Sequence, residues 1–404
     1  RLDFYSAPRP RRGHASLQPL HMSYVHIGSA DSAGELQSDL ASTDRFALDC
    51  EAAGFHRYSD RLCLIQLTTE RATYIIDPIA FDPTELLSGP LEDPDVEIVM
   101  HGADFDLRLL SRDLGIELRG LFDTQIAAQL LAEESIGLQA LLESRLGVKL
   151  SKKYQRADWA ERPLDDAMLE YAANDTRYLM RLADILTGEL EEAGRTAWAE
   201  EECRALELAA GVVESEPAEP EDPVVRVKGA RKLPTRAVAA LRVALEWRDE
   251  IARRKDRAIF RVVANGPLVE AVMERPKHVG DLTRIKGFPS RLAKEEGDEL
   301  LRRLDEIGRL PESELRPYPR TPRTGRGRPS PEIEELADRL KDVRNRKAAE
   351  VGLPRGTLLA NAVLLEVALA APADREQLLA VDGMREWRVD VIGDELLETI
   401  RRSG

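Results

Sequence analysis

The chain has 404 residues, too many for one core of ordinary size, so two or three domains are expected. Its three cysteines, Cys50, Cys63 and Cys203, are scattered without a CxxC pair, which argues against disulfides or a zinc site and indicates a reducing, cytoplasmic compartment. The formal net charge of −15 argues at first against a nucleic-acid partner, yet twelve acids in residues 189–222 carry most of it, so local patches decide what binds.

Strand patterns dominate the N-terminal part of the chain. Residues 1–22 contain Arg and Pro but no apolar stretch, and we expect them to form a disordered arm. Residues 46–51, 61–68 and 72–77 are separated by short polar turns, which predicts a three-strand antiparallel meander. Residues 96–100 form a short apolar run that predicts a further buried strand. No apolar run approaches the ~20 residues of a membrane span.

Helical patterns follow these strands. Asp104 is placed as the N-cap of a helix that opens at residues 104–110, and further helices are expected after Asp123 and over residues 138–146. Residues 165–190 predict one long amphipathic helix. Strands followed by alternating strands and helices predict an α/β domain in which helices flank a mixed sheet.

The C-terminal half contains an internal repeat. With a shift of 96 residues and no gap, the sequence GDELL at 297–301 falls on GDELL at 393–397, and Arg248 falls on Arg344. Each copy is long enough for a small helical bundle, and apolar positions recur in both with helical spacing. Neither copy has clustered His or Cys or paired acids at metal spacing, so no catalytic role is expected there.

Five residues of the N-terminal domain could form one chemical site. Asp49 and Glu51 alternate along a strand and share one face, where they repel each other unless a cation lies between them. Hard oxygen ligands of this kind suit Mg²⁺ or Mn²⁺. Asp106 is expected in the first turn of a helix that follows a strand end, and Tyr171 and Asp175 lie four residues apart on one helix face.

The four acids together suit phosphodiester hydrolysis. They would contribute about four negative charges, matched by two divalent ions about 4 Å apart that activate water and stabilise the leaving oxygen. Tyr171, with a free pKa of about 10, is a poor base at neutral pH and is assigned to hydrogen-bonding and aiming the attacking water. Taken singly, each residue also has a structural interpretation: a solvated acid, an acid favoured by a helix dipole, or an aromatic packed on the sheet.

These motifs resemble those of a known family. In their order, Asp49-x-Glu51, His101-x4-Asp106 and Tyr171-x3-Asp175 resemble the DEDD 3′–5′ exonucleases, in the subclass with Tyr in the third motif. The segments at 122–125, 158–159 and 162–164 resemble the surroundings of these motifs in ribonuclease D, and the two repeats resemble HRDC domains. An exonuclease followed by two HRDC domains is the bacterial ribonuclease D arrangement, and the likeness covers residues 23–404.

The resemblance implies a ribonuclease H-like exonuclease domain followed by two all-α HRDC-like bundles. It implies an exoribonuclease that trims RNA 3′ ends, including structured tRNA precursors, and releases nucleoside 5′-monophosphates with two Mg²⁺ or Mn²⁺ ions as cofactors. No membrane and no organic cofactor are expected. The expected boundaries are 1–22 for the arm, 23–210 for the exonuclease domain, 211–230 for an acidic linker, 231–308 for the first bundle, 309–330 for an Arg/Pro-rich linker and 331–404 for the second bundle.

Six further residues could contact RNA. Three could stack on or wedge terminal bases, and three basic ones lie in a loop before the expected catalytic helix, where they could contact phosphates. They are Phe55, His56 and Phe105, and Lys152, Lys153 and Arg156. For each basic residue the alternative is a solvated charge, and for Phe105 a place in the core.

Two alternative functions remain open. A DNA exonuclease would use the same chemistry, because the sequence does not decide the sugar. A non-catalytic RNA-binding scaffold would have a decayed nuclease domain, although all four carboxylates and the tyrosine are present here. The acidic segment 189–222 is unexpected in an RNA binder, so this side of the molecule is not expected to touch much substrate.

Overall fold

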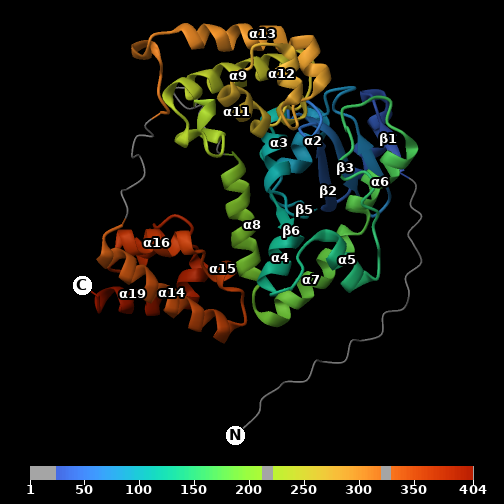
Figure 1. Ribbon diagram of the computed structural model, residues 1–404. Coiled ribbons are helices and arrows are strands. Elements are labelled where there is room, and N and C mark those ends of the chain that lie inside the picture. Colours follow the sequence, from blue (N-terminus) through green and yellow to red (C-terminus); the bar gives the residue numbers. More distant parts are fainter. Residues whose placement is uncertain (1–23, 212–221, 320–328, 404) are drawn as a thin grey trace.

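The computed structural model describes residues 24–211, 222–319 and 329–403 (Figure 1). The expected arm at 1–22, residues 212–221 of the expected acidic linker and residues 320–328 of the Arg/Pro-rich linker lie outside these ranges. The described residues form an α/β domain and two helical bundles, as the sequence predicts.

A mixed six-strand sheet forms the centre of the α/β domain. Its strands lie in the order β1-β4-β3-β2-β5-β6. The pairs β2–β3 and β3–β4 are antiparallel and the other pairs are parallel, which confirms the predicted meander and the buried strand beside it. The strands are β1 (Tyr24–Ile27), β2 (Arg45–Ala52), β3 (Leu62–Thr68), β4 (Thr73–Ile76), β5 (Glu97–Met100) and β6 (Leu121–Asp123). The short strands β1 and β6 were not predicted.

Two layers of helices cover the sheet. Phe46, Leu48 and Cys50 of β2 face a core that also includes residues of α1, α2, α3 and α8. Ala47, on the opposite face of β2, packs against Leu179 of α7, and α6 covers the neighbouring strands on that side. The helices are α1 (Gly34–Leu40), α2 (Thr84–Glu92), α3 (Asp104–Leu114), α4 (Thr124–Leu130), α5 (Leu138–Leu146), α6 (Asp166–Arg177), α7 (Leu179–Ala193) and α8 (Thr196–Gly211). Asp49 and Glu51 share the face of Ala47, so the alternation of β2 directs them toward α6.

Two predicted helix features are wrong in detail. The helix expected over residues 165–190 is two helices, because Tyr178 (φ −111°, ψ −1°) ends α6 and precedes α7. Ala103, not Asp104, is the N-cap of α3. The carboxylate of Asp123 accepts hydrogen bonds from the backbone N–H groups of Gly102 and Ala103, so a distant side chain fixes the start of this helix.

The two bundles show the repeat in the structure, and the last long helix of the first copy corresponds to two shorter helices joined by a π-helical turn in the second. The first contains α9 (Thr235–Arg254), α10 (Ile259–Val262), α11 (Asn265–Glu274), α12 (Val279–Arg284) and α13 (Ser290–Arg309). The second contains α14 (Pro331–Val351), α15 (Arg355–Leu358), α16 (Asn361–Ala370), α17 (Arg375–Leu379), α18 (Glu386–Arg388) and α19 (Asp394–Arg401). Buried Arg248 donates to Asn265 Oδ1 at 2.7 Å, and buried Arg344 donates to Asn361 Oδ1 at 2.9 Å. The same internal contact therefore stabilises both copies.

Part of the expected acidic linker packs into the first bundle. Pro223–Arg226 forms a 3-10 helix, and Val224 and Val227 are buried in the same core as α9. Asp222 caps this turn and forms an ion pair with Arg242 of α9 at 2.6 Å. We therefore propose that the first bundle begins near Asp222. The sequence did not predict this packing, because the segment contains acidic residues and prolines and only a few valines.

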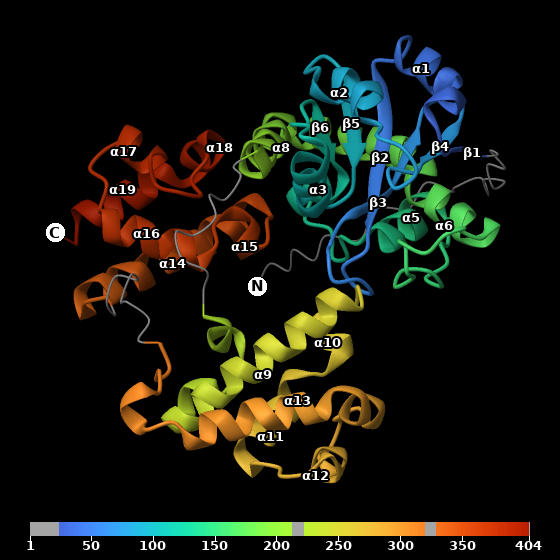
Figure 2. The same ribbon diagram turned by 90° about the horizontal axis from the view of Figure 1, so that it is seen from above.

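The first bundle contacts the loop that follows β2 in the α/β domain (Figure 2). The hydroxyl of Tyr58 donates to Asp249 of α9 at 3.0 Å, and the backbone N–H of Ala258 donates to the carbonyl of His56 at 2.9 Å. Because this loop begins directly after Ala52, next to Glu51, the bundle lies beside the acidic residues predicted to be catalytic.

The second bundle docks on α8 instead. The rings of Trp198 and Trp387 stack with centroids 4.6 Å apart. Glu202 accepts a hydrogen bond from Trp387 Nε1 and pairs with Arg388, both at 2.7 Å. Acids of segment 189–222 thus bind another part of the protein. Among the described helices, none is both long and apolar enough for a membrane crossing.

Candidate active site

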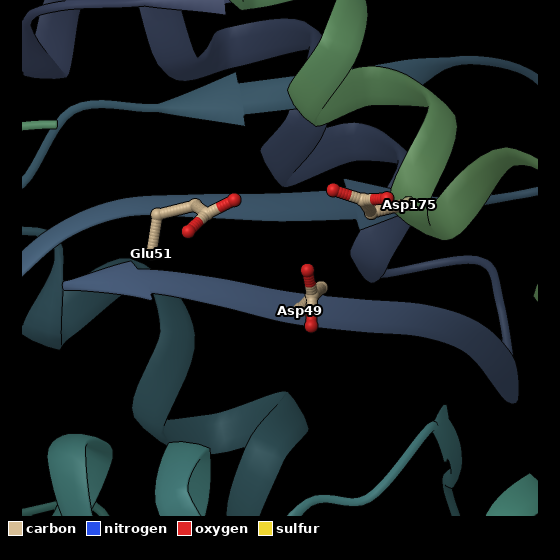
Figure 3. A group of neighbouring side chains, drawn as sticks. All are labelled: Asp49, Glu51 and Asp175. Carbon is tan, nitrogen blue, oxygen red and sulfur yellow. The ribbon is translucent and has the colours of Figure 1, made fainter. Parts of the chain in front are cut away.

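Three of the predicted carboxylates meet between β2 and α6. Asp49, Glu51 and Asp175 each offer an oxygen atom within 4.8 Å of the others. Figure 3 shows the two side chains of β2 beneath Asp175 of α6, with the carboxylate groups converging on the space between the strand and the helix. The strand and the helix are far apart in sequence, so only the fold brings these acids together.

Local structure sets the positions of these acids. The pairing of β2 with β3 shifts in register between Glu51 and Ala52, which leaves Cys63 as an extra residue in β3. Such bulges turn a strand and re-aim its side chains near active sites. On the other side, Thr176 of α6 hydrogen-bonds to Thr68 of β3, with 2.7 Å between the hydroxyl oxygens. This buried contact fixes the helix turn that carries Asp175.

Asp106 approaches the cluster from α3. It is buried and is not a member of the three-carboxylate group; burial, and then the negative charge of Asp49, raise its pKa well above the usual value. Buried Asp123 holds the preceding turn by accepting the N–H groups of Gly102 and Ala103, each at 2.9 Å. The sequence segment 122–125 therefore positions the loop from which Asp106 projects.

The acids have no basic partner. Burial raises the pKa of Asp49 to about 7 and, together with the charge of Asp49, the pKa of Asp175 to about 8. Burial and neighbouring acids raise the pKa of Glu51 and Asp106 well above their usual values. Within the described ranges no Lys or Arg forms an ion pair with any of the four. Clustered, half-buried carboxylates without a basic partner among the described residues fit a hard divalent cation, which would supply the missing positive charge.

Tyr171 faces the same cluster. Burial, and then the charges of Asp175, Glu51 and Asp49, raise the pKa of its phenol, which therefore stays protonated at neutral pH. Its ring lies 5.9 Å from that of Tyr154, and both tyrosines line a cavity of about 150 Å³ that also includes Asp175. A protonated phenol here can donate a hydrogen bond to a bound oxygen, but it cannot act as a base.

Three matches with known proteins agree with this geometry. The family model of the 3′–5′ exonuclease matches residues 24–191. The HRDC domain model matches residues 238–304 and 333–400. Ribonuclease D of Pseudomonas paraeruginosa is 30% identical over 360 residues, which span 88% of this chain and 91% of that protein. The chain belongs to the ribonuclease D family.

Other relatives extend the comparison. The crystal structure of Escherichia coli RNase D, described as an exoribonuclease involved in structured RNA processing, superimposes with a TM-score of 0.65 at 26% identity and covers 94% of this chain and 99% of that one. Protein RRP6-like 2 of Arabidopsis thaliana is 34% identical over 264 residues, but the match spans 62% of this chain and only 30% of that protein. As a member of the ribonuclease D family, the chain is a 3′–5′ exoribonuclease with two HRDC domains.

Of the six candidate RNA contacts, two aromatic residues line a cavity beside the acids of this ribonuclease D-type site. Phe55 and Phe105 are 40% and 43% exposed, and they line a cavity of about 420 Å³ together with Glu51. Large apolar side chains that remain exposed next to a catalytic cleft can stack on bases. Phe105 is therefore not a core residue, which was its alternative interpretation.

The other four candidates lie on either side of these cavities. His56 Nε2 lies 2.9 Å from the carbonyl oxygen of Arg156, whose guanidinium lies 5.6 Å from the centre of the Phe55 ring. Lys153 is exposed and donates to the hydroxyl of Tyr154 at 2.9 Å, and Lys152 is exposed beside it. Contacts with Phe55 or Tyr154 thus connect His56, Arg156 and Lys153 to residues that line the two cavities, and the role of all six candidates in RNA binding stays a prediction.

Sequence reasoning missed three residues of this ribonuclease D-type site. Tyr154 lies beside Tyr171, and Phe260 and Arg261 of the first bundle contact Phe55. Tyr154 could have been predicted from the sequence, because it is an aromatic residue in the basic loop that precedes α6. The other two carry no local signal, because only the docking of the bundle brings them to the cleft.

Proposed function

We propose that the chain trims RNA from its 3′ end by hydrolysing one phosphodiester bond at a time and releasing nucleoside 5′-monophosphates. The observation that carries this proposal is the group of three half-buried carboxylates within 4.8 Å of one another, without a basic partner among the described residues. Structured RNAs, including tRNA precursors, are the proposed substrates, since the E. coli relative is described as involved in structured RNA processing. A cytoplasmic location is proposed with it, because all three cysteines are free and buried.

Asp49, Glu51, Asp106 and Asp175 would hold two divalent ions, Mg²⁺ or Mn²⁺, which when bound activate water and offset the charge that develops on the phosphate. Because these acids are half-buried, electrostatic contacts with the scissile phosphate would be stronger there than in bulk water. Tyr171 donates its phenolic hydrogen to the attacking water and aims it, because its raised pKa keeps the proton in place.

The two bundles would not contribute equally to RNA binding. In residues 238–304, 15 Lys and Arg outnumber 11 Asp and Glu, whereas residues 333–400 contain 9 Lys and Arg against 14 Asp and Glu. Phosphate binding needs a basic surface. We therefore assign most of the binding of structured RNA to the first bundle, which also lies beside the cleft.

A direct assay tests the proposed function. A 5′-labelled RNA incubated with Mg²⁺ should shorten to a ladder of products from its 3′ end, and EDTA should stop the reaction. A matched DNA oligomer distinguishes the DNA exonuclease alternative, because the proposal requires the RNA to be degraded faster. RNA binding without any metal-dependent shortening would instead support the non-catalytic scaffold.

A further inference from the structure

Phe260 is an exposed aromatic residue where the first bundle contacts the nuclease domain. Its side chain is 53% exposed, and its ring lies 5.7 Å from that of Phe55. Large exposed apolar residues are few in the described chain, and four of the seven lie around this contact. They are Phe55, Phe105, Ile259 and Phe260.

The internal repeat shows that the bundle fold does not need this aromatic ring. The residue equivalent to Phe260 in the second bundle is Gly356, and the residue equivalent to Arg261 is Thr357. Both copies nevertheless form a four-residue helix at this place, α10 in one and α15 in the other. The two side chains of the first copy therefore serve something other than the bundle itself.

Two cations without acidic partners accompany the rings. Arg261 donates from Nε to the carbonyl of Phe55 at 2.7 Å, and its guanidinium lies 4.7 Å from the centre of that ring. Arg156 lies 5.6 Å from the same centre. Neither arginine forms an ion pair with a carboxylate in the described ranges, whereas nearby Arg57 and Arg108 do. Aromatic rings interleaved with free cations form the type of surface that binds single-stranded RNA.

The cavity beside the acids connects this surface to the site of hydrolysis. Glu51 of the carboxylate cluster, Phe55 and Phe105 all line it, and Phe260 contacts Phe55 from the adjoining bundle. An RNA 3′ end bound at the carboxylates would thus meet Phe55 first and Phe260 next. Negative phosphates along this path would complement Arg156 and Arg261.

We propose that Phe260 is a positioning residue that stacks on a base of the single-stranded RNA segment upstream of the scissile bond. With Phe55 and Phe105 it forms a stacking surface to which both domains contribute. Only an RNA whose single-stranded 3′ segment is long enough reaches the part of this surface that lies on the first bundle. This inference rests on the proposed exonuclease function, and it adds a substrate feature: several unpaired nucleotides are needed for full activity.

The test compares substrates of two lengths. The quantity measured is the ratio of kcat/KM for an unstructured RNA dodecamer to kcat/KM for a dinucleotide. In Phe260→Ala this ratio should fall about tenfold, the effect of one lost base–aromatic stack, and the loss should appear in KM. Phe260→Trp should restore the ratio. Phe260→Leu, which keeps an apolar contact with Phe55 but has no ring, should not.

Binding provides a second measurement that is independent of hydrolysis. In an Asp49→Asn background, the affinity for the dodecamer, measured by fluorescence anisotropy, should fall about tenfold when Phe260→Ala is added. Met273→Ala, which removes another exposed apolar residue of the same bundle, is the matched control and should leave the affinity unchanged.

Opposite results would overturn the inference. If Phe260→Leu behaves like the wild type, the ring only joins the two domains. If Phe260→Ala lowers the activity on both substrates by the same factor, or on neither, no upstream base is stacked there. A wild-type protein that does not shorten RNA at all would instead overturn the proposed function.

Discussion

Asp175 of α6 lies opposite Asp49 of β2, and both carboxyl groups titrate far above their usual range, at about 8 and about 7. In an unfolded chain an Asp titrates at about 3.9. Between about pH 4 and pH 8 the folded protein therefore retains protons that the unfolded chain has released. This difference makes the stability of the metal-free protein depend on pH.

We predict that the free energy of unfolding of the metal-free protein falls as the pH rises through this window. Mg²⁺ should replace the protons, so its stabilising effect should be larger at about pH 8 than at about pH 5. Urea unfolding at several pH values, with Mg²⁺ or with EDTA, measures both effects. In Asp175→Asn the pH dependence should become shallower; an unchanged slope would mean that these groups are not its source.

Replacement of Asp49 by Asn should abolish metal-dependent trimming while RNA binding largely remains. Charge stabilisation by a bound metal contributes several kcal/mol to the transition state, so kcat should fall by about a thousandfold or more. The same change should stabilise the metal-free protein, because it removes one buried repulsive charge. Single-turnover assays and anisotropy binding measure the two properties. Activity that persisted in this variant would contradict the assignment of the site.

Tyr171→Phe should lower kcat by about a hundredfold, because one hydrogen bond to the attacking water is lost, while KM changes little. Steady-state kinetics on a short RNA separate the two constants. The matched control is Tyr178→Phe, whose ring is buried in a different core and should leave kcat unchanged. An equal effect of the two substitutions would indicate that Tyr171 acts only through packing.

Asp123→Ala should destabilise the protein by about 2–4 kcal/mol, because the N–H groups of Gly102 and Ala103 lose their acceptor inside the fold. Activity should fall as well, since the turn that carries Asp106 is released. Urea unfolding gives the stability and the RNA ladder gives the activity. Asp82→Ala, which removes an exposed acceptor in a local turn, should have a much smaller effect on both.

Glu202→Ala should release the second bundle from α8. The substitution leaves Trp387 Nε1 and the guanidinium of Arg388 without their acceptor, at a cost of about 2–4 kcal/mol. Small-angle X-ray scattering should then report a larger radius of gyration. Glu200→Ala, on the same helix but without a hydrogen bond or ion pair to the bundle among the described residues, is the control and should leave the radius unchanged.

Local sequence patterns predicted the parts of the fold that depend on interactions between residues close together in the sequence. The alternation of Asp49 and Glu51 identified the strand face that meets α6, and the repeat predicted two helical bundles, although the segment equivalent to α13 is divided into α18, a π-helical turn and α19 in the second copy. The end of α6 at Tyr178 was missed, because the apolar spacing continues through it. The cap of α3 was missed because Asp123, remote in the sequence, supplies it. Phe260 was missed because its role depends on how two domains dock.

The two bundles attach to the nuclease domain through side chains that only one copy has. Trp387 and Arg388 bind α8, but their equivalents in the first copy are Arg291 and Leu292. Phe260 meets Phe55, but its equivalent in the second copy is Gly356. A chain with its two bundles exchanged would lose both attachments. Duplication thus gave this molecule two bundles of related helical fold whose outer surfaces are no longer interchangeable.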